Sequence, residues 1–122
     1  MRAVSTWDLS YDAKAWSLNQ ERTKHWAWRN AKVEEWVDAF YWAAKDAHIP
    51  RCETIAVTVD VQMPGVVQDI CNCYPAAKAA IDGVVLAGVI VDDGPAHLVA
   101  MTFTAPVHAK QPRLTLKVQQ LT

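Results

Sequence analysis

Alternation of apolar and polar side chains between Glu53 and Met63 constrains the fold more than any other feature of the sequence. Every second residue from Ile55 onward is apolar, and the residues between them are small or polar. Such alternation is typical of a β-strand that turns one face to the core and the other away from it. Pro64 and Gly65 follow as a turn. The sequence therefore predicts a strand over residues 53–63, in a sheet with one buried face.

Two further stretches have the three- and four-residue spacing of helices. The first runs from about His25 to His48 with apolar side chains along one stripe, and Pro50 stops it. The second spans about Pro75 to Ala87, because proline suits a first helical turn and the glycine that follows suits a helix end. We therefore expect two helices packed on the sheet.

The remaining segments complete an α/β arrangement. Residues 2–7 are expected to form a short strand, followed by a polar loop through Ser17 and Asn19. Two alternating runs, His97 to Thr104 and Arg113 to Leu121, are predicted to pair as an antiparallel hairpin. The expected order is (β)αβαββ, a small mixed β-sheet with two packed helices, in one domain of 122 residues.

Composition places the chain among folded, soluble proteins. It is 52% hydrophobic and 20% charged, and it has no unbroken apolar run of the roughly 18 residues that a membrane helix needs. The N-terminus lacks the apolar core of a signal peptide, and three cysteines cannot all pair within one chain, so we expect a reducing cytoplasm and no membrane partner. The net charge of −1 argues against a protein that coats nucleic acid, but it does not exclude a nuclease.

All six tryptophans lie in the first third of the chain, which is more than the core of one small domain readily buries. Aromatic side chains are enriched at protein interfaces, so this distribution predicts a homodimer. Trp26 and Trp28, at the start of the first helix, are also candidates to stack on unpaired bases. Packing in the core or at a dimer interface is the commoner use of such side chains.

Four aspartates and one lysine bracket the second predicted helix. Asp69 precedes it, Lys78 and Asp82 lie four residues apart on one face of it, and Asp92 and Asp93 follow it. Acids at the ends of elements beside a sheet are typical of binding sites. Oxygen-rich clusters of this kind hold Mg²⁺, a hard cation that acts on phosphate esters. The pattern therefore favours phosphodiester chemistry.

Two plainer interpretations compete with a catalytic one. Lys78 and Asp82 have the spacing of an ordinary surface ion pair. Cys71 and Cys73, together with Cys52, suggest a zinc site, but their spacing is poor, because structural zinc uses cysteine pairs separated by at least two residues. We therefore expect ordinary thiols rather than zinc ligands.

In order and spacing, these motifs resemble the RusA family of Holliday junction resolvases, found in phages and prophages. The resemblance is carried by Asp69-Ile-Cys-Asn72, by Lys78-Ala-Ala-Ile-Asp82, and by the acidic pair that ends the segment from Ala87 to Asp93. The segment from Leu18 to Ala27 is similar to the N-terminal part of actinobacteriophage members. Together the similar segments cover about Ser17 to Leu98.

The resemblance implies a homodimeric, Mg²⁺-dependent endonuclease that cuts four-way DNA junctions symmetrically, in a bacterial or phage-infected cytoplasm. Asp69 matches the first acid of the family's D-x-D-N segment, Asn72 its asparagine, Lys78 the functional lysine and Asp93 the final essential acid. Asp82 and Asp92 match further acids of the family.

Two departures from the family pattern affect the expected site. Cys71 stands where the family has its second acid, and three extra residues separate Asn72 from Lys78. The first departure removes a metal ligand, and the second moves the start of the helix. Asp82 is therefore expected to supply the missing carboxylate.

The expected roles follow from these matches. Asp69, Asp82, Asp92 and Asp93 are the candidate Mg²⁺ ligands, and Lys78 is expected to neutralise an oxygen of the scissile phosphate. The candidate DNA-binding residues are Lys78, Asn72, Arg22, Lys24 and Arg29. Two rival hypotheses are a catalytically weakened protein that binds branched DNA, and a small phage interaction module whose acids are merely solvated.

Overall fold

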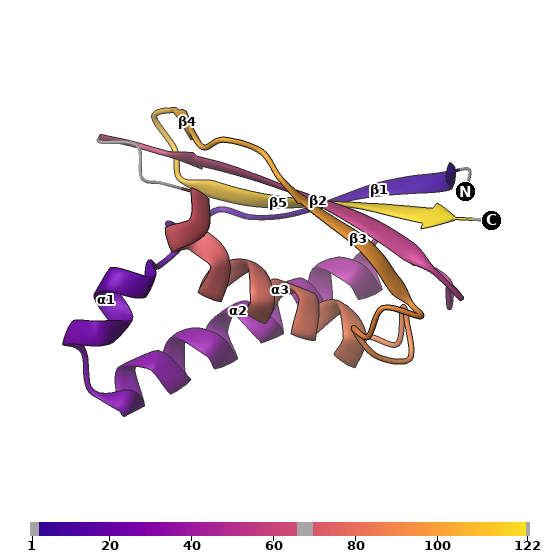
Figure 1. Ribbon diagram of the computed structural model, residues 1–122, viewed down its shortest axis with the longest axis horizontal. Helices are drawn as coiled ribbons and strands as arrows, with labels where there is room; N and C mark the ends of the chain where they lie inside the picture. Colours follow the sequence, from indigo (N-terminus) through magenta and orange to yellow (C-terminus); the bar gives the residue numbers. More distant parts are fainter. Residues whose placement is uncertain (1–2, 66–69, 122) are drawn as a thin grey trace.

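The computed structural model describes residues 3–65 and 70–121, and within them a mixed sheet forms one layer while the helices lie against one of its faces (Figure 1). The strands are β1 (Ala3–Tyr11), β2 (Ile55–Met63), β3 (Leu98–Phe103), β4 (Val107–His108) and β5 (Arg113–Leu121). The helices are α1 (Leu18–Thr23), α2 (Trp26–Asp46) and α3 (Tyr74–Leu86), with a 3-10 turn, η1 (Ile70–Cys73), before α3. The α/β class is confirmed, with a five-stranded sheet and three α-helices in the described part rather than two.

The predicted strand of alternating residues is confirmed as β2, which begins at Ile55, two residues later than expected. Every second side chain of β2, from Ile55 to Met63, is buried. On the neighbouring strand β5, Leu114, Leu116 and Val118 are buried on the same side. These rows meet the helices and form the centre of the core.

The predicted antiparallel hairpin of the last two long strands is wrong. The sheet order is β1-β5-β2-β3, so β5 lies between β1 and β2, while β3 pairs parallel with β2 on its other side. β3 runs parallel because α3 carries the chain back along the sheet between β2 and β3, as a crossover connection must. Alternation identified the strands, but it contains no information about their partners.

The helix α2 is confirmed within two residues at each end, but the polar loop predicted before it contains the helix α1. Ser17 caps α1: its hydroxyl accepts from the Gln20 N–H at 3.1 Å, and the Gln20 side chain accepts from the Ser17 N–H at 3.0 Å. This reciprocal pair satisfies two backbone donors that a short helix would otherwise leave unpaired. The strand predicted over residues 2–7 is also too short, because β1 extends to Tyr11.

The helix α3 packs closely across α2 at Gly83. A Cβ atom at this position would collide with the Val37 carbonyl oxygen and would lie 2.9 Å from the Tyr41 nitrogen and 3.0 Å from the Phe40 Cβ. Only glycine permits this approach of the two backbones. The crossing therefore fixes where α3, and every side chain on it, lies relative to α2.

The tryptophans divide between the core and the surface. Trp16 and Trp36 are buried and pack edge to face, with ring centroids 5.7 Å apart. Trp26 and Trp42 are 68% and 55% exposed. None of the helices in the described ranges is both long enough and apolar enough to cross a bilayer.

Candidate functional site

The structure brings Lys78, Asp82 and Asp93 together on the exposed side of α3. The Lys78 ammonium donates to Asp82 Oδ1 at 2.5 Å and to Asp93 Oδ2 at 2.6 Å. The first contact follows from the four-residue spacing on one helix. The second joins residues 15 positions apart, so the segment after α3 must fold back along the helix.

A turn after α3 places Asp93 within reach of Lys78. Gly88 has φ +87°, a left-handed conformation that glycine adopts without strain, and it reverses the chain after the helix. The returning segment is then held by the Cys52 N–H, which donates to the Val89 carbonyl at 2.7 Å, and by Arg51, which donates to the Gly88 carbonyl at 3.2 Å. The position of Asp93 is therefore anchored to the chain just before β2.

The cluster is a half-exposed cation between two anions. The side chains of Lys78, Asp82 and Asp93 are 43%, 43% and 39% exposed. Burial is the largest single influence and lowers the pKa of Lys78, but hydrogen bonds and charge attraction to Asp82 and Asp93 together leave that pKa raised above its usual value. The hydrogen bond from Lys78 holds the pKa of Asp93 below its usual value. These two shifts favour the charged forms of Lys78 and Asp93 at neutral pH.

Asp92 and Asn72 make no contact with this cluster in the described part of the chain. Asp92 is exposed, and its Oδ1 accepts from the Gly94 N–H at 2.8 Å within its own turn. Asn72 lies on η1, before α3. Asp69 lies outside the described residues.

The donor chemistry at Asp82 and Asp93 fits Mg²⁺. Both supply hard carboxylate oxygens, and both already meet one cation, the Lys78 ammonium. Mg²⁺ in proteins is commonly held by one or two carboxylates, with waters and substrate phosphates as its remaining ligands. Among the residues that the structure describes, no three His, Cys, Asp or Glu side chains form a metal-binding group. Asp82 and Asp93 therefore fit as a two-carboxylate site.

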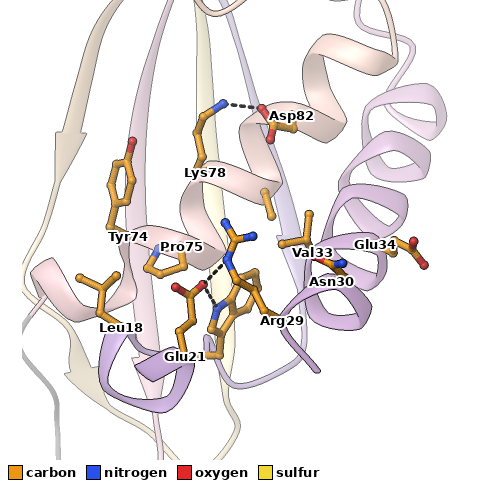
Figure 2. A pocket seen from close by; sticks show the side chains of 12 residues that line it. Leu18, Glu21, Arg29, Asn30, Val33, Glu34, Tyr74, Pro75, Lys78 and Asp82 are labelled. Atoms are coloured by element: carbon orange, nitrogen blue, oxygen red, sulfur yellow. Dashed lines mark hydrogen bonds and ion pairs between the residues drawn. The ribbon is translucent and has the colours of Figure 1, made fainter. Parts of the chain in front are cut away.

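A cavity of about 390 Å³ lies between α1, α2 and α3, beside Lys78 and Asp82 (Figure 2). Its lining is formed by Trp16, Leu18, Glu21, Arg29, Asn30, Val33, Glu34, Tyr74, Pro75, Lys78, Ala79 and Asp82. Across it from Lys78, the Glu21 carboxylate accepts from Trp16 Nε1 at 2.8 Å and from Arg29 Nε at 3.2 Å. Sequence reasoning missed this cavity, because it depends on how α1 docks against the other two helices.

The predicted DNA-binding residues Arg22, Lys24 and Arg29 gather along the segment that joins α1 to α2. Arg22 lies in the last turn of α1, Lys24 is its C-cap, and Arg29 is in the first turns of α2. The ammonium groups of Lys24 and Lys32 each lie 5.9 Å from the centroid of the Trp28 ring, within the range of cation–π attraction. This end of the helical layer therefore combines basic groups with aromatic rings.

No protein-family model matches the chain, and a search of curated proteins returns no match to it. The resemblance to the RusA family accordingly rests on the order and spacing of the motifs alone.

Proposed function

We propose that the chain is a Mg²⁺-dependent endonuclease that cuts branched DNA, with four-way junctions as its substrate, in the manner of the RusA family that its motifs resemble. One observation carries the proposal. Lys78, Asp82 and Asp93 meet at hydrogen-bond distance on an exposed face of α3, although Asp93 is distant in sequence. A lysine with two carboxylates on an accessible surface is the residue set that metal-assisted phosphodiester hydrolysis uses.

In this proposal Asp82 and Asp93 hold the metal, with Asp69 as the expected third carboxylate. The bound Mg²⁺ supplies an activated water and stabilises charge on the phosphate. Lys78 remains protonated at neutral pH, because both of its hydrogen bonds raise its pKa. It is therefore available to neutralise a phosphate oxygen when DNA approaches, as the resemblance implies.

The DNA arms are proposed to lie along the basic segment that includes Arg22, Lys24 and Arg29. With a net charge of −1, the protein needs a local basic surface to attract phosphates. Affinity should then fall linearly with the logarithm of salt concentration, with a slope set by the number of phosphate contacts. Asn72, before α3, is the remaining proposed DNA contact.

A homodimer is part of the proposal, because two identical sites related by two-fold symmetry would cut two strands of a symmetric junction. The exposed ring of Trp42 is available for such an interface. Sedimentation at micromolar concentration should give a dimer. A monomer under these conditions would defeat the paired-cut mechanism.

A second candidate function is binding of branched DNA without efficient cleavage. The Lys78 ammonium already pairs with both carboxylates, so each of them has a cationic partner without a metal ion. Cys71 also replaces an acid of the family pattern, and a thiol is a poor ligand for hard Mg²⁺.

Cleavage and binding of a synthetic four-way junction separate the two functions. Replacing Asp69, Asp82 or Asp93 with Asn should abolish Mg²⁺-dependent cleavage and leave binding intact, because no phosphate contact is removed. Cys71→Ser should change little. Lys78→Ala should reduce cleavage far more than binding, since its proposed partner is the transition state.

A matched control is Asp38→Asn, which removes an exposed carboxylate of α2 and should leave cleavage unchanged. Junction binding by the native chain without any cleavage would establish the second function. A chain that binds no branched DNA would instead be an interaction module with solvated acids.

A further inference from the structure

The cavity between the three helices has the composition of a site for a flat, partly apolar group. Leu18, Val33, Pro75 and Ala79 supply apolar surface from all three helices. Tyr74, which begins α3, adds an aromatic ring that is 48% exposed. Pockets that bind small organic groups typically combine such walls with a few placed polar groups.

The cavity lining contains two ion pairs, and the Glu34 carboxylate and the Asn30 amide lie outside them. Glu21 holds Arg29, and Asp82 holds Lys78, so neither cation presents an uncompensated charge (Figure 2). The Asn30 side chain, by contrast, has no hydrogen-bond partner within the described part of the chain. An amide supplies both donors and an acceptor.

This charge balance decides which part of a nucleotide suits the cavity. The lining carries three carboxylates, including Glu34, against the two cations Arg29 and Lys78. A phosphate placed inside the cavity, rather than at its Lys78 edge, would meet net negative charge. An uncharged heterocycle with N–H donors would not be repelled by this negative charge, and its flat faces would lie against the apolar walls.

We propose that this cavity receives one unpaired nucleobase of the bound DNA, displaced from the stack beside the phosphate that Lys78 contacts. The inference rests on the proposed function and specifies its substrate: DNA with at least one unpaired base at the branch point. Asn30 hydrogen-bonds the edge of the base, and Tyr74 lies at its face. Enzymes that extrude a base read it in this way, by stacking and by hydrogen bonds to its edge.

The position of the cavity supports this assignment over the exposed indole of Trp26, at the start of α2. Lys78 and Asp82 are themselves part of the lining. A base in the cavity therefore belongs to a nucleotide next to the reacting phosphate. Trp26 is not among the lining residues and is placed instead among the basic groups that attract the DNA arms.

The test measures affinity for two four-way junctions in EDTA, so that cleavage plays no part. One junction carries an unpaired base at the branch point, and the other has an abasic site at the same position. The native chain should prefer the unpaired base by about tenfold, the size expected for stacking of one base. Fully paired duplex serves as the reference for non-specific binding.

Two pairs of variants assign this preference to the cavity. Val33→Trp fills it, and Ala31→Trp adds the same ring to an exposed position of α2 outside it. Asn30→Leu removes the unpaired amide from an exposed position where folding is not at risk, and Asn19→Leu is its control on α1. Val33→Trp and Asn30→Leu should lose the preference for the base, and both controls should keep it.

Photocross-linking locates the base directly. A junction with 5-iodouracil as the unpaired base should cross-link to the peptide that contains Tyr74. Cross-linking to Trp26 alone, or equal affinity of the native chain for the base and abasic junctions, would overturn the cavity assignment while leaving the endonuclease proposal intact. Failure to bind any branched DNA would overturn both.

Discussion

Replacing Gly83 with alanine tests whether the close crossing of α2 and α3 limits the stability of the fold. In an isolated helix this change would be favourable by about 1 kcal/mol, because glycine has the larger backbone entropy to lose. Here the added methyl group meets the Val37 carbonyl oxygen and the Tyr41 nitrogen. Both obstructing atoms belong to the backbone of α2, so no side-chain rotation relieves the contact.

The expected size of the effect follows from these opposing contributions. Inserting a methyl group into a packed interior costs about 1–3 kcal/mol, and backbone obstruction places this case at the upper end. After the gain in helix propensity is subtracted, we expect a net loss of about 2 kcal/mol. This is a large part of the about 5–15 kcal/mol that stabilises a typical domain.

Urea denaturation measures this loss. With a urea dependence of about 2 kcal/mol per molar, the midpoint of Gly83→Ala should lie about 1 M below that of the native chain. Leu86→Ala is the control on the same helix, because Leu86 is 65% exposed and its truncation should leave the midpoint nearly unchanged. An unchanged or higher midpoint for Gly83→Ala would show that α2 and α3 can separate without cost, and would refute the reasoning.

Three further predictions concern single side chains. The folded pKa of Asp93 lies below its ordinary value of 3.8, so the pairing of Asp93 with Lys78 stabilises the fold above pH 3.8, and this stabilisation is lost as pH falls through the lowered pKa. Asp93→Asn should therefore remove this part of the acid dependence of the urea midpoint. An acid dependence identical to that of the native chain would refute the prediction. The hydrogen bond to Glu35 raises the pKa of Tyr11 to about 12, so Glu35→Gln should bring tyrosinate absorbance to lower pH, and an unshifted titration would contradict this cause. In the described part of the chain the buried Trp36 Nε1 has no hydrogen-bond partner. Trp36→Phe should therefore lower the unfolding free energy by less than about 1 kcal/mol, whereas Trp36→Ala should lower it by about 3–5 kcal/mol. Equal losses for the two variants would contradict this prediction.

The strands could be predicted from the sequence, but their partners could not. Alternation from Ile55 to Met63 reports which side chains are buried, and β2 has that burial pattern. The same signal in Arg113–Leu121 does not distinguish pairing with β3 from insertion between β1 and β2. Pairing depends on the crossover through α3 and on contacts far apart in sequence, and no local pattern encodes these.

The helix α1 was predictable from a signal that the loop interpretation overlooked. Ser17 and Gln20 have the three-residue spacing of a capping box, and both of its hydrogen bonds are present. The polar composition of the segment was instead interpreted as a loop. A capping signal before a short helix therefore outweighs the absence of an apolar stripe.

The candidate site was predictable in part. The spacing of Lys78 and Asp82 fixes their contact, because both lie on one face of one helix. Which acid of the pair Asp92 and Asp93 joins them depends on the turn at Gly88 and on its anchoring to the chain before β2. That choice depends on tertiary structure, and so does the cavity beside the cluster.

The place of β5 in the sheet has a consequence for the order in which the protein is made. During synthesis β1 and β2 leave the ribosome first, yet the strand that joins them is the last element in the sequence. Until Arg113–Leu121 emerges, β1 has no neighbour, and one edge of the largely apolar β2 stays open. An unpaired apolar edge is a template for strands of other chains. Loss of this one segment would therefore divide the sheet in two, and the nascent chain is most prone to aggregate while Arg113–Leu121 is still inside the ribosome.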